Sequence, residues 1–363
     1  MRQRTNPPPV GAWPLAAALA LVAGMADAQS ADVFAPLPGP KEVNEARANL
    51  GAILFFDERL SGDTGKSCAS CHDPEKGWGD GEPLSDGYTG VSYFRNAPGL
   101  FNVANRNVLM WDGRLDGADM ATVTRDMLTE SHTMNMDSRL AQERLKQVPE
   151  YATMFEEAFG GDPYGGKIYS AIGEYLKTIR TQNAPFDAFL NGDAGGISDQ
   201  AKRGMDLFAG KAGCSACHSG AMMSDGGVHA TGVADNPDMA VNADRQITML
   251  RHFATMGTPN YMNMRQDVGN YVVTKEDEDI GKFATPILWD VGQTAPYMHS
   301  GVFSTLPQVV AFYNAGNDKI APLGLSADEE ADLVAFLESL TGDAPAVTVP
   351  ELPDYAVRVV GEN

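Results

Sequence analysis

The spacing of apolar residues predicts a mainly helical chain. From residue 41 to residue 56 the apolar positions recur at intervals of three and four, which is typical of a helix with one buried face. Further helices are predicted over residues 137–146, 150–159 and 166–181. Glycine, aspartate, serine and proline punctuate residues 77–90, which indicates an irregular loop. Almost no segment alternates apolar and polar residues as a half-buried strand does.

A last helix is predicted over residues 326–340. Ser326 stands at the N-cap position, and Asp328 and Glu329 in the first turn favour the positive end of the helix dipole. The residues predicted to be buried are Leu333, Phe336, Leu337 and Leu340. The proline-rich residues after Gly342 predict an extended tail.

Two pentapeptides, C-A-S-C-H at residues 68–72 and C-S-A-C-H at residues 214–218, contain every cysteine of the chain. In C-x-x-C-H the two thiols form thioether bonds to one haem and the histidine binds its iron. A disulfide framework or a closed zinc site would need a different set of cysteines. We therefore predict two covalently bound haem c groups. The residues that hold them are Cys68, Cys71, His72, Cys214, Cys217 and His218, with His72 and His218 as proximal iron ligands.

The second half of the chain repeats the order of the first. The spacing G-x-x-L-F precedes both haem motifs, at residues 51–55 and 204–208, and the echo continues between residues 94–113 and 283–301. The glycine-rich residues 194–198 form the predicted linker. We predict two tandem class I cytochrome c-like domains with long loops, related by internal duplication. The predicted segments are residues 1–28 (signal peptide), 29–193 (N-terminal haem domain), 194–345 (C-terminal haem domain) and 346–363 (tail).

The N-terminus has the organisation of a secretory signal peptide. Two arginines precede an apolar run from Leu15 to Met25, and Ala26 and Ala28 flank the predicted cleavage site. No later segment approaches the roughly 18 consecutive apolar residues of a membrane-spanning helix. We therefore predict a periplasmic protein with no membrane span. Covalent haem attachment, which bacteria carry out outside the cytoplasmic membrane, fits that location.

The chain is strongly acidic, with 48 acidic and 27 basic residues and a net charge of −21. This charge argues against nucleic acid, whose phosphates require a basic face, as a partner. It suits a soluble redox partner with a basic docking patch, steered by long-range attraction. The alternative is that the acidity serves only solubility.

Motifs beyond the haem pentapeptides resemble those of the bacterial di-haem cytochrome c peroxidase family. They are R-N-A-P at residues 95–98, M-W-D-G-R at residues 110–114 and T-A-P-Y-M-H-S-G at residues 294–301. The resemblance covers essentially the whole chain after the leader. Residues 305–314 resemble the MauG branch, whose members oxidise side chains of a partner protein during cofactor maturation.

The resemblance implies roles for residues around the second haem. Tyr313 matches the position where MauG has a tyrosinate as distal iron ligand and ordinary peroxidases have Met; a core aromatic is its alternative role. A phenolate lowers the reduction potential of iron, whereas Met raises it. Trp111 matches a tryptophan that relays electrons between the haems. Asn96, Thr294 and Pro296 match the ligands of a calcium ion, which prefers carbonyl and amide oxygens.

The segment expected beside the first haem departs from the family pattern. Peroxidases have a glutamate in a segment N-P-V-E-M, whereas residues 128–134 read L-T-E-S-H-T-M, with His132 at the glutamate position. His132 suits acid-base catalysis because imidazole exchanges protons near neutral pH. It can equally serve as an iron ligand, in which case Glu130 supplies the carboxylate. Met127, which the repeat places opposite Tyr313, is a further candidate ligand.

Three functions follow from these observations. The leading one is a peroxidase that reduces hydrogen peroxide at the N-terminal haem, with the C-terminal haem relaying electrons from a small cytochrome c or cupredoxin. The first alternative is a MauG-like enzyme that takes electrons from side chains of a protein substrate. The second is a non-enzymatic electron carrier, in which His132 or Met127 occupies the open position of the first iron.

Overall fold

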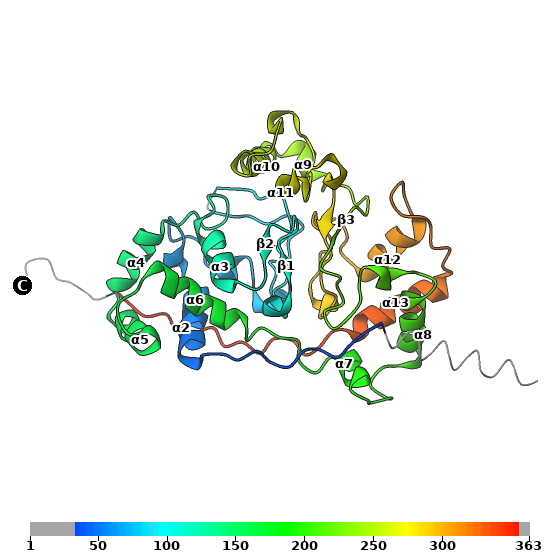
Figure 1. Cartoon of the computed structure of the whole chain (residues 1–363), viewed down its shortest axis with the longest axis horizontal. Coiled ribbons are helices and arrows are strands. Elements are labelled where there is room, and N and C mark those ends of the chain that lie inside the picture. Colours follow the sequence, from blue (N-terminus) through cyan, green and yellow to red (C-terminus); the bar gives the residue numbers. More distant parts are fainter. Residues whose placement is uncertain (1–32, 89, 356–363) are drawn as a thin grey trace, which may run out of the picture.

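The computed structural model describes residues 33–88 and 90–355. The predicted signal peptide and the last residues of the predicted tail lie outside this part. Two helical lobes stand side by side, and a smaller helical cap lies above them (Figure 1). The mainly helical character predicted from the sequence is confirmed. No helix among these residues is long and apolar enough to cross a membrane.

The elements follow the chain from the first lobe to the second. The first lobe contains α2 (Glu45–Phe55), α3 (Met120–Thr129), α4 (Ser138–Lys146), α5 (Pro149–Phe159) and α6 (Gly165–Leu176). The second lobe contains α7 (Pro185–Leu190), α8 (Asp199–Ala209), α12 (Leu306–Ala315) and α13 (Ala327–Ser339). The cap contains α9 (Asp238–Val241), α10 (Ala243–Thr255) and α11 (Tyr271–Thr274).

Two short antiparallel strand pairs lie where the lobes meet (Figure 1). They are β1 (Val108–Leu109) with β2 (Leu115–Asp116), and β3 (Val228–His229) with β4 (Phe283–Ala284). The backbone N–H of Ala284 in β4 donates a hydrogen bond to the carbonyl of Trp111 in the first lobe (2.8 Å). The strand pairs therefore connect the two halves of the chain.

The predicted helices before and after the haem motifs are present with small changes in their ends. The closing helix α13 has Ser326 as its N-cap, and Ser326 and Glu329 form a capping box. Helix α6 ends at Leu176, five residues before its predicted end. Beyond it Thr181 accepts a hydrogen bond from Asn102 (2.6 Å) and donates one to Asp290, so this residue serves the contact between the lobes instead of the helix.

The two lobes share one way of packing their helices. In the first lobe α2 crosses α6, and a Cβ added at Gly51 would lie 2.0 Å from the carbonyl oxygen of Ala171. In the second lobe α8 crosses α13, and a Cβ added at Gly204 would lie 1.9 Å from the carbonyl oxygen of Asp332. Both distances are far inside van der Waals contact. The glycine of each G-x-x-L-F sequence is thus required for the close approach of two helix backbones.

Each lobe has its own hydrophobic core, and each terminal segment packs against the opposite lobe. Phe34, near the N-terminus, is buried in the second core with Phe186 and Phe336, and its ring lies 5.5 and 5.8 Å from theirs. Near the C-terminus, Val347 packs against the first core. The blue and red ends of the chain can be followed across both lobes in Figure 1.

A third, smaller core joins the cap to the first lobe. The loop residues Leu84 and Phe94 are buried there with Phe253 of α10 and Val272 of α11. Phe94 meets Phe253 edge to face, with ring centroids 6.3 Å apart. The cap therefore belongs to the second half of the sequence but covers a loop of the first half.

Candidate haem and peroxide sites

The first haem motif begins with a short 3-10 turn, Cys68–Ser70, and Cys71 and His72 follow it directly. The Nδ1 atom of His72 donates a hydrogen bond to the carbonyl of Trp78 (2.9 Å), because a carbonyl oxygen only accepts. Burial lowers the pKa of His72 despite this bond. The imidazole is therefore neutral, with Nε2 free to bind a metal, as an iron ligand requires.

The second motif has the same construction. The turn Cys214–Ala216 precedes His218, and the Nδ1 atom of His218 donates to the carbonyl of Met223 (2.9 Å). Burial likewise lowers the pKa of His218. Two histidines prepared in the same way, each directly after a pair of cysteines, fit two haem groups.

The cysteines have neutral thiols. The four cysteines are unpaired, and burial raises the pKa of Cys68 to about 12 and of Cys214 to about 11. Reactive redox thiols have a lowered pKa instead. The structure thus favours thioether attachment over a redox dithiol at both motifs.

A cavity of about 350 Å³ lies at the second motif. His218 and Tyr313 of α12 both line it, and most of the remaining wall is apolar. Burial raises the pKa of Tyr313 to about 12, against a hydrogen bond with Thr231 that lowers it. The structure therefore brings the predicted proximal histidine and the predicted distal tyrosine to one cavity.

Trp111 and the residues predicted to bind calcium line the same cavity, where the two halves of the chain meet; these residues are Asn96, Trp111, Thr294 and Pro296. The indole Nε1 of Trp111 donates to the carbonyl of Asn96 (2.9 Å). The side chain of Asn96 donates to the carbonyl of Glu82 (2.9 Å), which leaves its Oδ1 atom to accept. The calcium site stays a prediction.

Arg106 also lines this cavity, and sequence reasoning missed it. Its Nη2 atom donates to the carbonyls of Gly99 (2.7 Å) and Phe101 (2.8 Å), while its buried Nε has no partner in the described part of the chain. Burial lowers the pKa of Arg106 to about 10. A buried cation with an unpaired donor fits an anionic group, such as a haem carboxylate, in this cavity.

The segment that carries His132 runs beside the first haem motif. The backbone N–H of Gly62, six residues before Cys68, donates to the carbonyl of Met134 (2.9 Å). On the other side, the sulfur of Cys71 lies 3.7 Å from the carbonyl oxygen of Asp86. A Cβ added at the next residue, Gly87, would lie 1.9 Å from the carbonyl oxygen of His132. The backbone of His132 thus packs against a loop that touches the first haem motif.

Arg114 and Glu130 organise the surroundings of His132. Arg114 donates two hydrogen bonds to the carboxylate of Glu130 (3.0 and 3.1 Å). The Nε2 atom of His132 lies 3.0 Å from Oε2 of that carboxylate, an oxygen that also accepts from Arg114. Burial alone would raise the pKa of Glu130, but His132 and Arg114 outweigh it and bring the pKa to about 2. Glu130 is therefore a fixed anion, and His132 is the better proton carrier.

Met127 and His252 lie on two helices near His132, α3 and α10. Met127 lies on the last turn of α3, and its carbonyl accepts a hydrogen bond from Thr133 (2.5 Å). His252 of the cap is buried with Nε2 3.3 Å from a carboxylate oxygen of Asp112, and its ring meets that of His132 edge to face. No sequence motif marks His252; only the packing of the cap brings it to this site.

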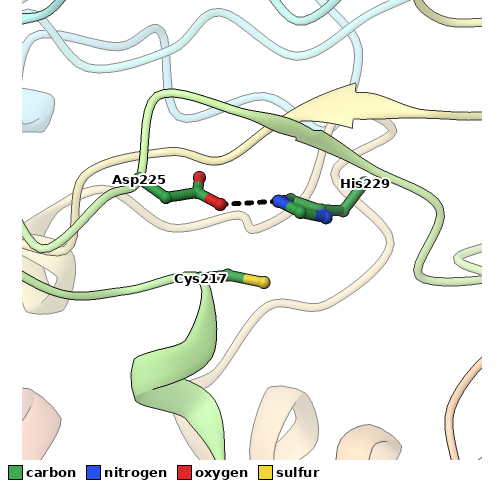
Figure 2. A group of neighbouring side chains, drawn as sticks. All are labelled: Cys217, Asp225 and His229. Carbon is green, nitrogen blue, oxygen red and sulfur yellow. Dashed lines mark hydrogen bonds and ion pairs between the residues drawn. The ribbon is translucent and has the colours of Figure 1, made fainter.

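Figure 2 shows a cluster at the edge of the second motif, formed by Cys217, Asp225 and His229. The Nε2 atom of His229 lies 2.7 Å from the carboxylate of Asp225, and one potential ligand atom of each residue lies within 4.8 Å of the others. Cys217 belongs to C-x-x-C-H, so its sulfur is expected in a thioether bond and not as a metal-binding thiolate. Asp225 and His229 form a hydrogen-bonded pair at the edge of the haem site.

Comparison with known proteins gives consistent results. A sequence model of the family described as "Di-haem cytochrome c peroxidase" matches residues 45–195. Cytochrome-c peroxidase IdrP2 of Denitromonas iodatirespirans is 55% identical over 349 residues, which cover 95% of each chain. Methylamine utilization protein MauG of Methylorubrum extorquens is 35% identical over 329 residues, covering 88% of this chain and 84% of MauG.

A solved structure agrees with the sequence comparisons. A MauG-like protein associated with microbial copper homeostasis superposes with a TM-score of 0.71 at 26% identity, covering 86% of this chain and 97% of that one. The similarity thus extends over both lobes.

Proposed function

This chain belongs to the di-haem cytochrome c peroxidase family, and we propose that it reduces hydrogen peroxide at the N-terminal haem site. It is an oxidoreductase of the peroxidase type, since relatives at 55% and 52% identity over nearly the whole chain are cytochrome-c peroxidases. The observation that carries the choice of site is the arrangement of His132, Glu130 and Arg114 beside the first haem motif.

His132 and Glu130 have different roles in proton transfer at this site. The haem iron, when bound, supplies the position at which peroxide binds and the electrons that break its O–O bond. His132 takes the proton from one peroxide oxygen and delivers it to the other, which leaves as water. Glu130, kept ionised by Arg114, stabilises the imidazolium that exists between these two transfers. Each peroxide consumes two electrons and two protons and gives two waters.

We assign electron relay to the second site. His218 would hold the C-terminal haem, and Tyr313, on the wall of the same cavity, would supply the second protein ligand to its iron. Trp111 lies between the two halves, hydrogen-bonded to Asn96 and to the backbone of Ala284, and passes electrons from one site to the other. The acidic chain suits a small cytochrome c or cupredoxin with a basic patch as the donor.

Both lobes, on this proposal, are class I cytochrome c-like domains that arose by duplication. The matched helix crossings at Gly51 and Gly204, each next to a haem motif, support it. The proposed domains are residues 29–193 and 194–345, with the tail after them. The packing of Ala184 and Phe186 in the second core favours a start of that domain near α7, about ten residues earlier.

The remaining assignments concern location and calcium. We propose that residues 1–28 direct export to the periplasm and are then removed. Asn96, Thr294 and Pro296, gathered at the junction of the lobes, are the proposed calcium ligands.

A second candidate function is a MauG-like reaction, in which the electrons come from side chains of a partner protein. The observation that favours it is Tyr313 at the second haem cavity, because a phenolate ligand stabilises oxidised iron. The non-enzymatic carrier is set aside, because the most similar relatives named above are peroxidases.

Stopped-flow mixing of the fully oxidised protein with one equivalent of hydrogen peroxide tests the proposal. A fast change in the haem spectrum without prior reduction would show an open N-terminal site and favour the MauG-like reaction. A reaction that begins only after one haem is reduced would favour the cytochrome c peroxidase. Absence of any reaction in both states would contradict the proposed function.

A further inference from the structure

Tyr93 lies against His132 in the N-terminal site. Their rings are parallel within 8°, with centroids 5.3 Å apart. The hydroxyl of Tyr93 is buried and makes no hydrogen bond within the part of the chain that the structure describes, whereas the Nε2 atom of His132 lies 3.0 Å from the carboxylate of Glu130. Buried polar atoms without partners are rare in folded proteins, so the unpartnered hydroxyl of Tyr93, on a ring that stacks on His132, indicates that a further group binds there and completes its hydrogen bond.

The backbone on both sides of Tyr93 is fixed, so its ring is held in this place. Its N–H donates to the carbonyl of Ser85 (2.9 Å), and Arg245 of the cap donates to the carbonyls of Tyr93 and of Ser85 (3.0 Å). The next two residues are Phe94, buried against the cap, and Arg95, which is paired with Asp267. These contacts therefore hold the ring of Tyr93 parallel to the ring of His132.

Burial keeps the hydroxyl of Tyr93 protonated. Burial raises its pKa to about 12, and the nearby arginines Arg114 and Arg95 only partly oppose this effect. A protonated phenol offers one O–H donor. The group that completes the site must therefore accept a hydrogen bond, as an oxygen atom of peroxide does.

Two other roles fit the geometry less well. As a carrier of oxidising equivalents, the phenol would have to lose a proton to a nearby acceptor, and its hydroxyl makes no hydrogen bond to one among the described residues. For packing alone, a phenylalanine would fill the same space without burying an unpaired hydroxyl.

We propose that Tyr93 is a substrate-binding residue, whose hydroxyl donates a hydrogen bond to the peroxide held beside His132. This inference rests on the proposed function, which makes the N-terminal haem the site that takes peroxide. It adds a residue outside the segment 128–134, on a loop that the cap secures.

Fluoride binding to the oxidised holoprotein tests the inference, because fluoride binds ferric haem and accepts hydrogen bonds. Sodium fluoride titrations, followed by the haem spectrum, would compare the wild type with Tyr93→Phe and Tyr88→Phe. Tyr88 lies on the same loop but does not stack on His132, and Tyr88→Phe removes one hydroxyl oxygen, as Tyr93→Phe does. Loss of one hydrogen bond should weaken fluoride binding about tenfold in Tyr93→Phe and leave Tyr88→Phe unchanged.

Thermal unfolding supplies a second readout. Because the Tyr93 hydroxyl has no partner in the described chain, Tyr93→Phe should melt at the wild-type temperature or above it. A clearly lower melting temperature would show that the hydroxyl has a structural partner and would overturn the inference. Equal fluoride affinity in wild type and Tyr93→Phe, or equal weakening in both variants, would overturn it and leave the proposed function intact. A wild type that binds no fluoride, either fully oxidised or after one haem has been reduced, would contradict both, since its N-terminal iron would then never be open.

Discussion

Arg95 of the first lobe and Asp267 of the cap form a buried ion pair with two contacts, Nε to Oδ2 at 2.5 Å and Nη2 to Oδ1 at 2.8 Å. Each side chain is only 2% exposed. Burial works against both charges, but the attraction between them raises the pKa of Arg95 and lowers that of Asp267. The contact between the loop that carries Tyr93 and the cap therefore depends on both partners being present.

Asp267→Asn should lower the free energy of unfolding by about 1–3 kcal/mol, because it removes one of the two buried carboxylates, Asp267 and Asp112, that pair with the Arg95 cation. Urea denaturation followed by far-UV circular dichroism measures the loss. The matched control is Lys211→Gln, which breaks the exposed pair between Lys211 and Glu329 and should change stability little. Equal losses in the two variants would show that the buried pair contributes no more to the free energy of unfolding than the exposed pair does.

Gly204→Ala should destabilise the second lobe by about 1–3 kcal/mol or more, because the new Cβ meets a backbone oxygen that cannot move without separating α8 from α13. Gly51→Ala should do the same in the first lobe, where α2 meets α6. Gly39→Ala is the control, since a Cβ there has nothing within 4 Å. Wild-type melting temperatures for the first two variants would contradict the role given to these glycines.

His132→Gln should reduce kcat/KM for hydrogen peroxide by about 10²- to 10⁴-fold, because the site loses the group that carries the proton. Glu130→Gln should have a smaller effect, since Glu130 only stabilises the charged imidazole. Steady-state peroxide reduction with a reduced small cytochrome c measures both. A larger loss in Glu130→Gln than in His132→Gln would exchange their roles and make Glu130 the proton carrier.

Glu130 should also contribute a pH-dependent part of the stability. Its pKa of about 2 in the folded protein is lower than the ordinary value, so the contribution is complete above about pH 4.5 and is lost as the pH falls towards 2. The stability difference between wild type and Glu130→Gln should reach about 3 kcal/mol near pH 6 and shrink below pH 4.5. Urea titrations at several pH values measure it. Glu143→Gln, at an exposed position, should show no such trend, and a difference independent of pH would refute the assignment.

Tyr313→Met should raise the reduction potential of the C-terminal haem, since a thioether favours reduced iron more than a phenolate does. Spectroelectrochemical titration of both haems measures the change, and the N-terminal haem should keep its potential. The control is Tyr297→Phe, which removes a hydroxyl that donates to the carbonyl of Val291 in the same cavity. Unchanged potentials in Tyr313→Met would leave Tyr313 as a core aromatic.

Local sequence signals predicted the parts of the fold that repeat. The haem motifs, the capped closing helix and the glycine before each motif depend on residues close together in the chain, and the structure shows why each is there. The repeated G-x-x-L-F sequence pointed to Gly51 and Gly204, and the structure explains both, since each lies where two helix backbones cross.

The cap and its residues at the first site could not be predicted in the same way. His252 and Asp267 are buried because they meet charged groups of Asp112 and Arg95, more than a hundred residues away in sequence. Nothing in the local pattern of α10 separates a buried histidine from an exposed one. The same holds for Arg106, whose role follows only from its unpaired Nε in the cavity wall.

The exchange of terminal segments limits how the protein can be divided. Phe34 is buried in the second lobe, while Arg59 of the first lobe donates a hydrogen bond to the carbonyl of Pro353 (2.6 Å). A protease that cut the turn at residues 191–196 would therefore produce two fragments that stay associated. The order of the chain suggests that each lobe could be produced alone, but neither lobe is complete without the opposite end of the chain. A working single-haem fragment would need that end fused to it.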